Sequence, residues 1–239
     1  KFNFNPTRDI FFLKKLFNFF KNLNLKKVLE IGCYDGYILK QLQKKNYKVI
    51  GCEPSKGALI GKEFNIDIIN DFFSKSTFPN EKFDLIIMRH TLEHVPNLRK
   101  TMNDIIHVMH ERSILSIEVP NIEFYIEQGL LEVFSLQHIH YFSIKAFEQI
   151  ANDFDLMIMK IIKSPENIII FFQKKNINKI KLKKNLPVKK KTIPFNKFKL
   201  KIKKNSNKIN KIITGYEKNK IAFWGAGGFA VAAIYLYKL

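Results

Sequence analysis

The chain has 239 residues with a formal net charge of +20, and 46% of its residues are hydrophobic. This length and apolar content predict one α/β domain with a smaller addition, and they exclude a disordered chain. Its only two cysteines, Cys33 and Cys52, exclude a disulfide framework and a four-ligand zinc site, so we expect a protein of the reducing cytoplasm. The apolar runs are far shorter than the roughly 20 residues that a membrane span needs, so no membrane partner is expected.

Hydrophobic patterns alternate between helical and strand spacing over the first half of the chain. Residues 8–22 carry apolar side chains at helical spacing, and residues 27–31 form an apolar strand before a tight polar turn. Further strands and helices are expected in alternation, the strands at 47–52, 66–69, 83–88 and 113–119, and the helices at 37–45, 55–64 and 97–110. Short connections between such elements predict a parallel sheet with right-handed crossovers.

The segment after this alternation predicts how the sheet is closed. A helix is expected at 143–154, with Ser143 as its cap, and two strands at 156–163 and 168–173 flank a turn at Ser164–Asn167. The two strands read as an antiparallel hairpin. Five parallel units and a hairpin predict a seven-stranded Rossmann-like α/β sheet, distinct from a plain dinucleotide-binding fold.

Composition divides the chain into three parts. Residues 1–173 form the expected α/β domain, 174–220 a lysine-rich connector, and 221–239 the beginning of a truncated second Rossmann-like domain with a glycine turn at 225–228. Because the chain begins at Lys1 and ends inside an expected helix, we expect a fragment of a longer protein.

The positive charge is concentrated in the connector. Residues 173–220 hold 18 lysines, one acidic residue and no arginine, which leaves a balance of +3 for the rest of the chain. Specific phosphate and base recognition favours arginine, so a solvated connector is the preferred interpretation. Binding of RNA or another polyanion by this segment stays open as the alternative.

The turn between the first strand and the next helix is suited to a cofactor. Its residues run Glu30-Ile31-Gly32-Cys33-Tyr34-Asp35-Gly36. Glycines at 32 and 36 let a ligand approach the backbone, and the following helix begins with free N–H groups. An acidic residue before such a turn suits an ammonium group better than a pyrophosphate. S-adenosylmethionine carries an ammonium group, and it is the expected cofactor.

Two later strand ends support this prediction. Glu53 ends the second strand, 21 residues after Gly32, where a carboxylate can bind both ribose hydroxyls. Asp71 follows the third strand at the position for the adenine amino group, with Phe72 and Phe73 available to pack on the ring. A helix cap is the alternative for Asp71. The candidate cofactor-binding residues are Glu30, Gly32, Tyr34, Gly36, Glu53, Asp71, Phe72 and Arg89.

These residues resemble the class I S-adenosylmethionine-dependent methyltransferases, over roughly residues 10–175. Residues 83–97, FDLIIMRHTLEHVPN, resemble the family's fourth motif, where the loop after the fourth strand faces the transferred methyl group. Within this class the chain resembles the sugar C-methyltransferases, through the segments EIGCYDGYIL, GCEPS, DFFS, EVPN, LQHIHYFS and IAFWGAGG. The resemblance implies methyl transfer to a sugar or nucleotide-sugar.

The chain also departs from that family. The family has a His-Glu-His segment before Tyr-Phe-Ser that supplies catalytic groups, and here Leu136 and Gln137 replace the first two residues while His138 keeps its place. Cysteines for the family's amino-terminal zinc module are absent. Either C- or O-methylation is therefore allowed, and an RNA methyltransferase remains an alternative.

The histidines are the candidate acid–base groups. His94 lies beside the expected methyl position, and His138 follows the fifth strand, so both are proposed as catalytic. His90 is expected to be structural, while His107 and His110 are expected three residues apart on one solvated helix. Glu93, His94, His138 and His140 could converge, but no closely spaced ligand motif joins them, and no metal is expected.

Overall fold

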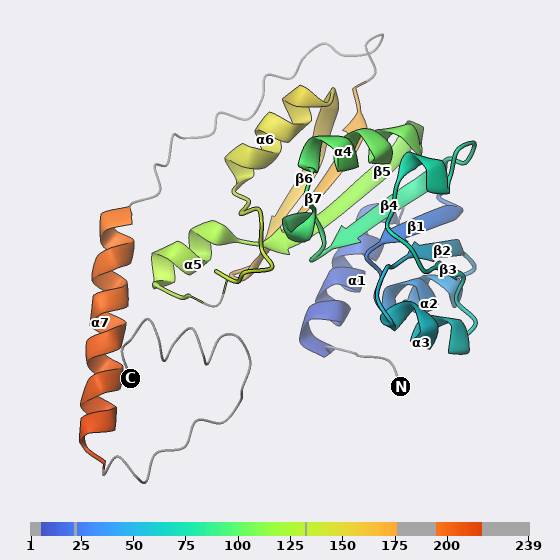
Figure 1. Ribbon diagram of the computed structural model, residues 1–239. Helices are drawn as coiled ribbons and strands as arrows, with labels where there is room; N and C mark the ends of the chain where they lie inside the picture. Colours follow the sequence, from blue (N-terminus) through green and yellow to red (C-terminus); the bar gives the residue numbers. More distant parts are fainter. Residues whose placement is uncertain (1–5, 22, 132, 176–194, 217–239) are drawn as a thin grey trace.

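The computed structural model describes residues 6–21, 23–131, 133–175 and 195–216. Its centre is a seven-stranded sheet in the order β3-β2-β1-β4-β5-β7-β6, in which β7 alone runs opposite to the other six strands (Figure 1). The strands are β1 (Lys27–Ile31), β2 (Lys48–Cys52), β3 (Ile68–Ile69), β4 (Phe83–Arg89), β5 (Met109–Pro120), β6 (Leu156–Lys163) and β7 (Asn167–Lys174). The predicted Rossmann-like sheet with a closing antiparallel hairpin is confirmed.

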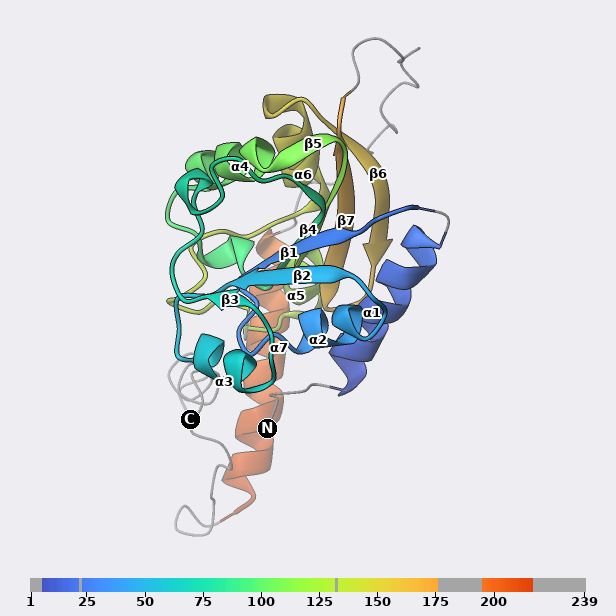
Figure 2. The same ribbon diagram turned by 90° about the vertical axis from the view of Figure 1, so that its right-hand side faces the viewer.

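Helices cover both faces of this sheet, and Figure 2 shows α4 and α6 on one side with α1 on the other. The helices are α1 (Pro6–Phe20), α2 (Tyr37–Gln43), α3 (Gly57–Glu63), α4 (Leu98–His107), α5 (Ile122–Gln128), α6 (Ile144–Asp153) and α7 (Phe195–Thr214). Two 3₁₀ turns, η1 (Lys75–Thr77) and η2 (Leu92–His94), interrupt the connections around β4.

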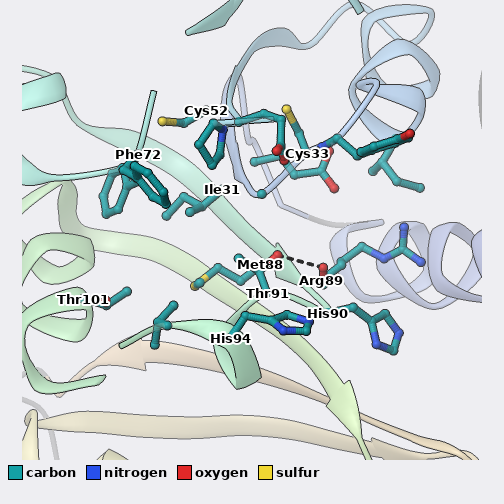
Figure 3. A pocket seen from close by; sticks show the side chains of 18 of the residues that line it. Ile31, Cys33, Cys52, Phe72, Met88, Arg89, His90, Thr91, His94 and Thr101 are labelled. Carbon is teal, nitrogen blue, oxygen red and sulfur yellow. Dashed lines mark hydrogen bonds between the residues drawn. The ribbon is translucent and has the colours of Figure 1, made fainter. Parts of the chain in front are cut away.

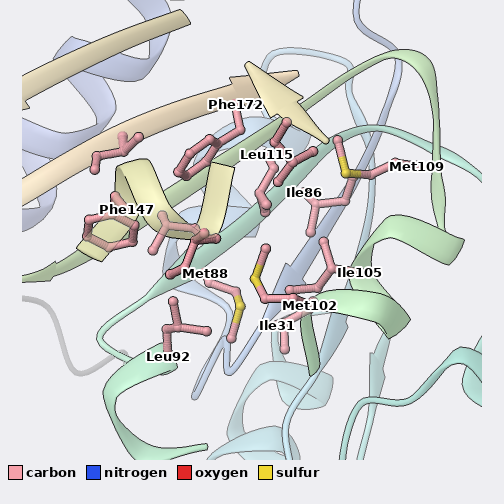
Figure 4. Packing of buried hydrophobic residues seen from close by; sticks show 14 of the residues in the cluster. Ile31, Ile86, Met88, Leu92, Met102, Ile105, Met109, Leu115, Phe147 and Phe172 are labelled. Carbon is pink, nitrogen blue, oxygen red and sulfur yellow. The ribbon is translucent and has the colours of Figure 1, made fainter. Parts of the chain in front are cut away.

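The strand β4 explains why both layers form. Its residues Ile86 and Met88 point into the cluster under α4 and α6, where Met102 and Phe147 are also fully buried (Figure 4). The alternate residues Leu85 and Ile87 belong to the opposite cluster, with aromatic and aliphatic side chains of α1 and α2. Successive side chains of a strand face opposite sides, so a continuous apolar run is buried on both.

Several local predictions agree with the structure. The side chain of Asn97 accepts a hydrogen bond from Lys100 N at 2.9 Å, and that of Ser143 accepts one from Ala146 N, so both residues cap the helices that follow them. In the β6–β7 turn, Ser164 N donates to Asn167 O at 2.9 Å. The predicted cap at Ser143 and the hairpin turn therefore lie where the sequence indicated.

The prediction that His107 and His110 share one helix is wrong. Helix α4 ends at His107, and His110 lies in β5, which begins at Met109. The carboxylate of Asp84 accepts from His110 Nε2 at 3.0 Å, across a bulged pairing of β4 and β5. The apolar residues that seemed to continue the helix instead begin the strand.

The lysine-rich segment contains a helix where the structure describes it. Helix α7 lies beside α5 and away from the sheet (Figure 1). The ring of Phe198 packs 5.7 Å from that of Phe134, and Asn205 Nδ2 donates to Gly129 O at 3.2 Å. Residues 221–239, with the expected second Rossmann-like unit, lie outside the described residues. No helix in the described ranges is long and apolar enough to cross a membrane.

Candidate functional site

A cavity of about 670 Å³ lies at the carboxyl ends of β1, β2 and β4, where the strand order reverses (Figure 3). In parallel α/β sheets this reversal is where ligands bind, because the connections leave the sheet on opposite sides and open a crevice. The loops after β1 and β4 line it, together with the end of β2, the segment after β3 and the first turns of α1 and α4. The predicted cofactor loop is thus part of its wall.

The floor of the cavity is a tight contact between the loops after β1 and β4. Gly32 has a φ of +72°, and a Cβ atom there would lie 2.2 Å from Thr91 Oγ1. Thr91 Oγ1 is itself held because it donates to Arg89 O at 2.9 Å, the bond drawn in Figure 3. Gly36, at the start of α2, also has a φ of +72°. Glycine is therefore required at both predicted positions.

Glu30 is a buried acid on the cavity wall. Its side chain is almost fully buried, and its Oε2 atom has no hydrogen-bond partner in the described part of the chain. Burial raises the pKa of Glu30 to about 8, Arg89 opposes that rise, and the carboxylates of Asp9, Asp35 and Glu53 add to it. An ammonium group would supply both the missing donor and the missing positive charge.

Glu53 is fixed at the end of β2 by two backbone donors. Its Oε2 accepts from Tyr34 N at 2.9 Å and its Oε1 from Ser55 N at 2.8 Å. Each carboxylate oxygen keeps a further lone pair for a ligand hydroxyl. Tyr34 has a φ of +49°, so the backbone that holds Glu53 is in the left-handed region.

The segment after β3 contributes aromatic rings rather than a carboxylate. Phe72 and Phe73 line the cavity, and Phe72 is 75% exposed at its opening. Asp71 is exposed and is not among the lining residues; its Oδ1 accepts from Phe72 N at 2.7 Å. The structure therefore places Phe72 at the cavity and Asp71 next to it.

Arg89 lies on the cavity wall but is already engaged by two carboxylates. Its Nε donates to Glu118 at 2.7 Å, its Nη2 donates to Asp9 at 3.0 Å, and its guanidinium stacks on Phe12. Asp9 and Arg8 of α1 also line the cavity. Sequence reasoning missed this role of α1, because the helical pattern identifies its apolar face but not an ion pair to a residue 80 positions away.

The two candidate catalytic histidines lie together, with ring centroids 4.9 Å apart. His94 lines the cavity, whereas His138 lines a smaller cleft beside it, with Glu93 and His140. His90, at a φ of +47°, lines the main cavity with His94, and its Nδ1 is 3.4 Å from Glu93 Oε1. Figure 3 shows His90 and His94 on one side of the cavity and Cys33 on the other.

The cysteines are packing residues. Burial raises the pKa of Cys52 to about 12 and that of Cys33 higher still, so neither is a thiolate near neutral pH. Both thiols are free.

A family model described as a methyltransferase domain matches residues 8–161. The chain belongs to this methyltransferase family. The methyl donor of the family is S-adenosylmethionine, so the protein is an S-adenosylmethionine-dependent methyltransferase. A search of curated protein sequences finds no significant match.

Solved structures share the fold of this methyltransferase at low sequence identity. The plantazolicin methyltransferase BpumL, crystallised with a pentazolic desmethylPZN analogue and SAH, is 16% identical with a TM-score of 0.59, over 72% of this chain and 86% of BpumL. The PH0226 protein of Pyrococcus horikoshii is 14% identical with a TM-score of 0.59, over 72% and 93%. A methyltransferase of Archaeoglobus fulgidus is 16% identical with a TM-score of 0.53, over 70% and 94%.

Proposed function

We propose that this methyltransferase acts on a small polar acceptor, a sugar or nucleotide-sugar, at a carbon or a hydroxyl oxygen. The observation that carries the proposal is the single cavity that joins Glu30 and Glu53 to a wall of polar side chains from the loop after β4 and α4. Those side chains are His90, Thr91, His94, Asn97, Lys100 and Thr101. Their hydrogen-bonding groups suit a polyhydroxylated acceptor, and the motifs shared with sugar C-methyltransferases support the same class.

The residues assigned to the cofactor lie in the loop after β1 and at the ends of β1, β2, β3 and β4. Glu30 would bind the ammonium group, the backbone at Gly32 and Gly36 would pass beneath the ligand, and Glu53 would accept from the ribose hydroxyls. Tyr34 holds Glu53 through its backbone N–H. Asp71 and Phe72 are proposed at the adenine, and Arg89 is proposed to act by setting the charge around Glu30, since two carboxylates hold it.

The acceptor side is assigned to His94 and His138. When bound, S-adenosylmethionine supplies an electrophilic methyl group on its sulfonium. The protein must align the acceptor with that methyl group, and alignment contributes several kcal/mol to such displacements. His94 is at the cavity surface, where it can orient the acceptor or accept its proton. The ring of His138 lies against that of His94, with centroids 4.9 Å apart.

The remaining assignments concern the whole chain. We propose a methyltransferase domain at 1–173, a connector at 174–220 that includes α7, and the start of a second Rossmann-like domain at 221–239, all in the cytoplasm. BpumL, named as a plantazolicin methyltransferase, was crystallised with a pentazolic desmethylPZN analogue, and a compound of that kind is the competing acceptor class. RNA is a third, because α7 carries seven lysines and no acidic residue.

Calorimetric titration with S-adenosylhomocysteine tests the cofactor site. We expect one binding event on the full chain, and Glu53→Ala should weaken it by at least about tenfold, since each lost charge-assisted hydrogen bond is worth roughly 1.5–3 kcal/mol. Glu63→Ala, on α3 and outside the cavity, is the matched control. Unchanged affinity in the Glu53 variant, with a folded protein, would refute the ribose assignment.

Transfer of a labelled methyl group to candidate acceptors tests the substrate. We expect label in members of a nucleotide-sugar panel and none in bulk RNA. Label in RNA, with loss after deletion of residues 174–239, would overturn the sugar assignment in favour of the polyanion alternative.

A further inference from the structure

Three atoms of the kind that bind metals converge beside the cavity. One carboxylate oxygen of Glu93 and one ring nitrogen each of His94 and His138 all lie within 4.8 Å of one another. Glu93 and His94 belong to η2, after β4, whereas His138 belongs to the segment between α5 and α6. The fold therefore joins residues that no sequence motif connects.

The hydrogen bonds of the two histidines determine which nitrogen is available. Nδ1 of His94 lies 2.8 Å from Gln137 O, and Nδ1 of His138 lies 2.7 Å from Val133 O. A carbonyl oxygen only accepts, so each Nδ1 carries the proton and each Nε2 keeps a lone pair. Metal-binding histidines are usually oriented in this way: one ring nitrogen binds the metal, and the other donates to a backbone carbonyl or carboxylate.

The carboxylate of Glu93 lacks the partners that burial demands. It is 1% exposed, and neither of its oxygens has a hydrogen-bond partner in the described ranges. Its nearest basic group is His90 Nδ1, 3.4 Å from Oε1. Burying a carboxylate without hydrogen bonds is costly unless a cation neutralises it. The cluster thus holds a buried carboxylate without a hydrogen-bond partner and two imidazoles whose Nε2 atoms keep a lone pair.

The backbone holds the two segments in register. The carbonyl of Glu93 accepts from Ile139 N at 2.8 Å and from His140 N at 3.1 Å, and Nε2 of His140 lies 3.0 Å from Val95 O. The side chains of Glu93 and His138 therefore stand on a shared framework, as ligands of a defined site must.

We propose that Glu93, His94 and His138 bind a divalent transition-metal ion. Two imidazoles and one carboxylate match the donor preferences of Zn²⁺ and of Fe²⁺ or Co²⁺, whereas Mg²⁺ prefers oxygen ligands and water. Three protein ligands leave a coordination position open. The expectation of no metal rested on the absence of closely spaced ligands, and a site built from two distant segments does not need such spacing.

The role of this ion rests on the proposed function. Because His94 also lines the main cavity, the ion lies on the acceptor side. A bound transition metal lowers the pKa of a coordinated hydroxyl, so the acceptor hydroxyl would release its proton to solvent. In the metal-loaded protein the two histidines are then ligands, and neither takes the proton directly.

Equilibrium dialysis of the chelator-treated full chain against Zn²⁺ tests the site. We expect one tightly bound Zn²⁺ per chain. Glu93→Gln or His138→Asn should lower the affinity for Zn²⁺ by more than the roughly 100-fold that the loss of an outer-shell partner costs. His107→Asn is the matched control, because His107 is a histidine on α4 outside the cluster. Weak binding with no dependence on the three ligands would overturn the proposal.

Two further measurements do not depend on enzyme activity, and the first needs no variant that could fail to fold. In the unmodified chain, Zn²⁺ should raise the thermal midpoint of unfolding and Mg²⁺ at the same concentration should not. Co²⁺ should give absorption bands of a low-coordinate site that His94→Asn abolishes. If the unmodified chain binds S-adenosylhomocysteine but not Zn²⁺, the metal site alone is refuted. If the unmodified chain does not bind S-adenosylhomocysteine, the proposed cofactor site is refuted.

Discussion

At the scale of single residues, Glu30 combines a functional position with a cost in stability. Its pKa of about 8 in the folded protein is above the ordinary value of 4.5, so the folded state holds the proton more tightly than the unfolded state. Stability from this group is complete at low pH and is lost as the pH rises from about 4.5 to about 8. Above that range the buried carboxylate is ionised and opposes folding.

Glu30→Gln should therefore stabilise the protein at pH 8 and leave it nearly unchanged at pH 4, as measured by urea unfolding at both values. The same variant should bind S-adenosylmethionine more weakly, because the ammonium loses its ionic partner. In the unmodified protein, affinity should rise with pH by up to about tenfold per unit below the pKa of Glu30, since binding then expels one proton. A flat affinity profile would contradict the ammonium assignment.

At the scale of elements, α1 is attached to the sheet by an ion pair as well as by its apolar face. Arg89 of β4 contacts Asp9 of α1 and Glu118 of β5 while it stacks on Phe12, and all four side chains are buried. Removing Arg89 would take the ion pair from Glu118 and leave Asp9 with its longer contact to Arg8. The helix and the cavity wall that it forms depend on this network.

Arg89→Met should lower the free energy of unfolding by about 3–5 kcal/mol, since it removes the cation that pairs with the buried carboxylates of Glu118 and Asp9. Arg99→Met is the control: Arg99 is 70% exposed, its contact with Asp153 is 3.5 Å long, and such surface pairs contribute about 0–1 kcal/mol. Chemical unfolding of both variants gives the comparison. Equal losses in the two would show that the Arg89 network does not hold α1.

Sequence patterns predicted the order and direction of the elements for two reasons. Strands buried on both faces are continuous apolar runs, and turns with a positive φ carry glycine. They misplaced His110 because the apolar spacing of α4 continues into β5 without a break. The approach of His138 to His94 could not be derived from periodicity, because residues 133–141 form no helix or strand. The unpaired oxygen of Glu30 likewise becomes visible only when its neighbours are known.

At the scale of the whole molecule, the lysine-rich helix α7 contacts the methyltransferase domain at α5 and the residues that follow it. Phe198 is half-buried against Phe134, while Phe195 of the same helix is largely exposed. Docking of α7 therefore depends on a few side chains.

Phe198→Ala should speed tryptic cleavage after the lysines of α7, because local opening becomes easier, and it should leave the unfolding of the domain unchanged. Phe195→Ala should leave both unchanged. Mass spectrometry of timed digests, beside thermal unfolding, measures the two effects. A lower thermal midpoint in Phe198→Ala would mean that α7 belongs to the core fold.

The contact between Gly32 and Thr91 also affects how the two reactants stay aligned. These residues lie in the loops proposed for the donor and for the acceptor, and the space between them is smaller than one methyl group. A shift of one loop toward the other is therefore blocked, so the distance between the two binding surfaces cannot shrink at this point. A larger side chain at position 91 would fit only if the loop after β1 moved away. A substitution on the acceptor side would therefore also displace the loop proposed for the donor.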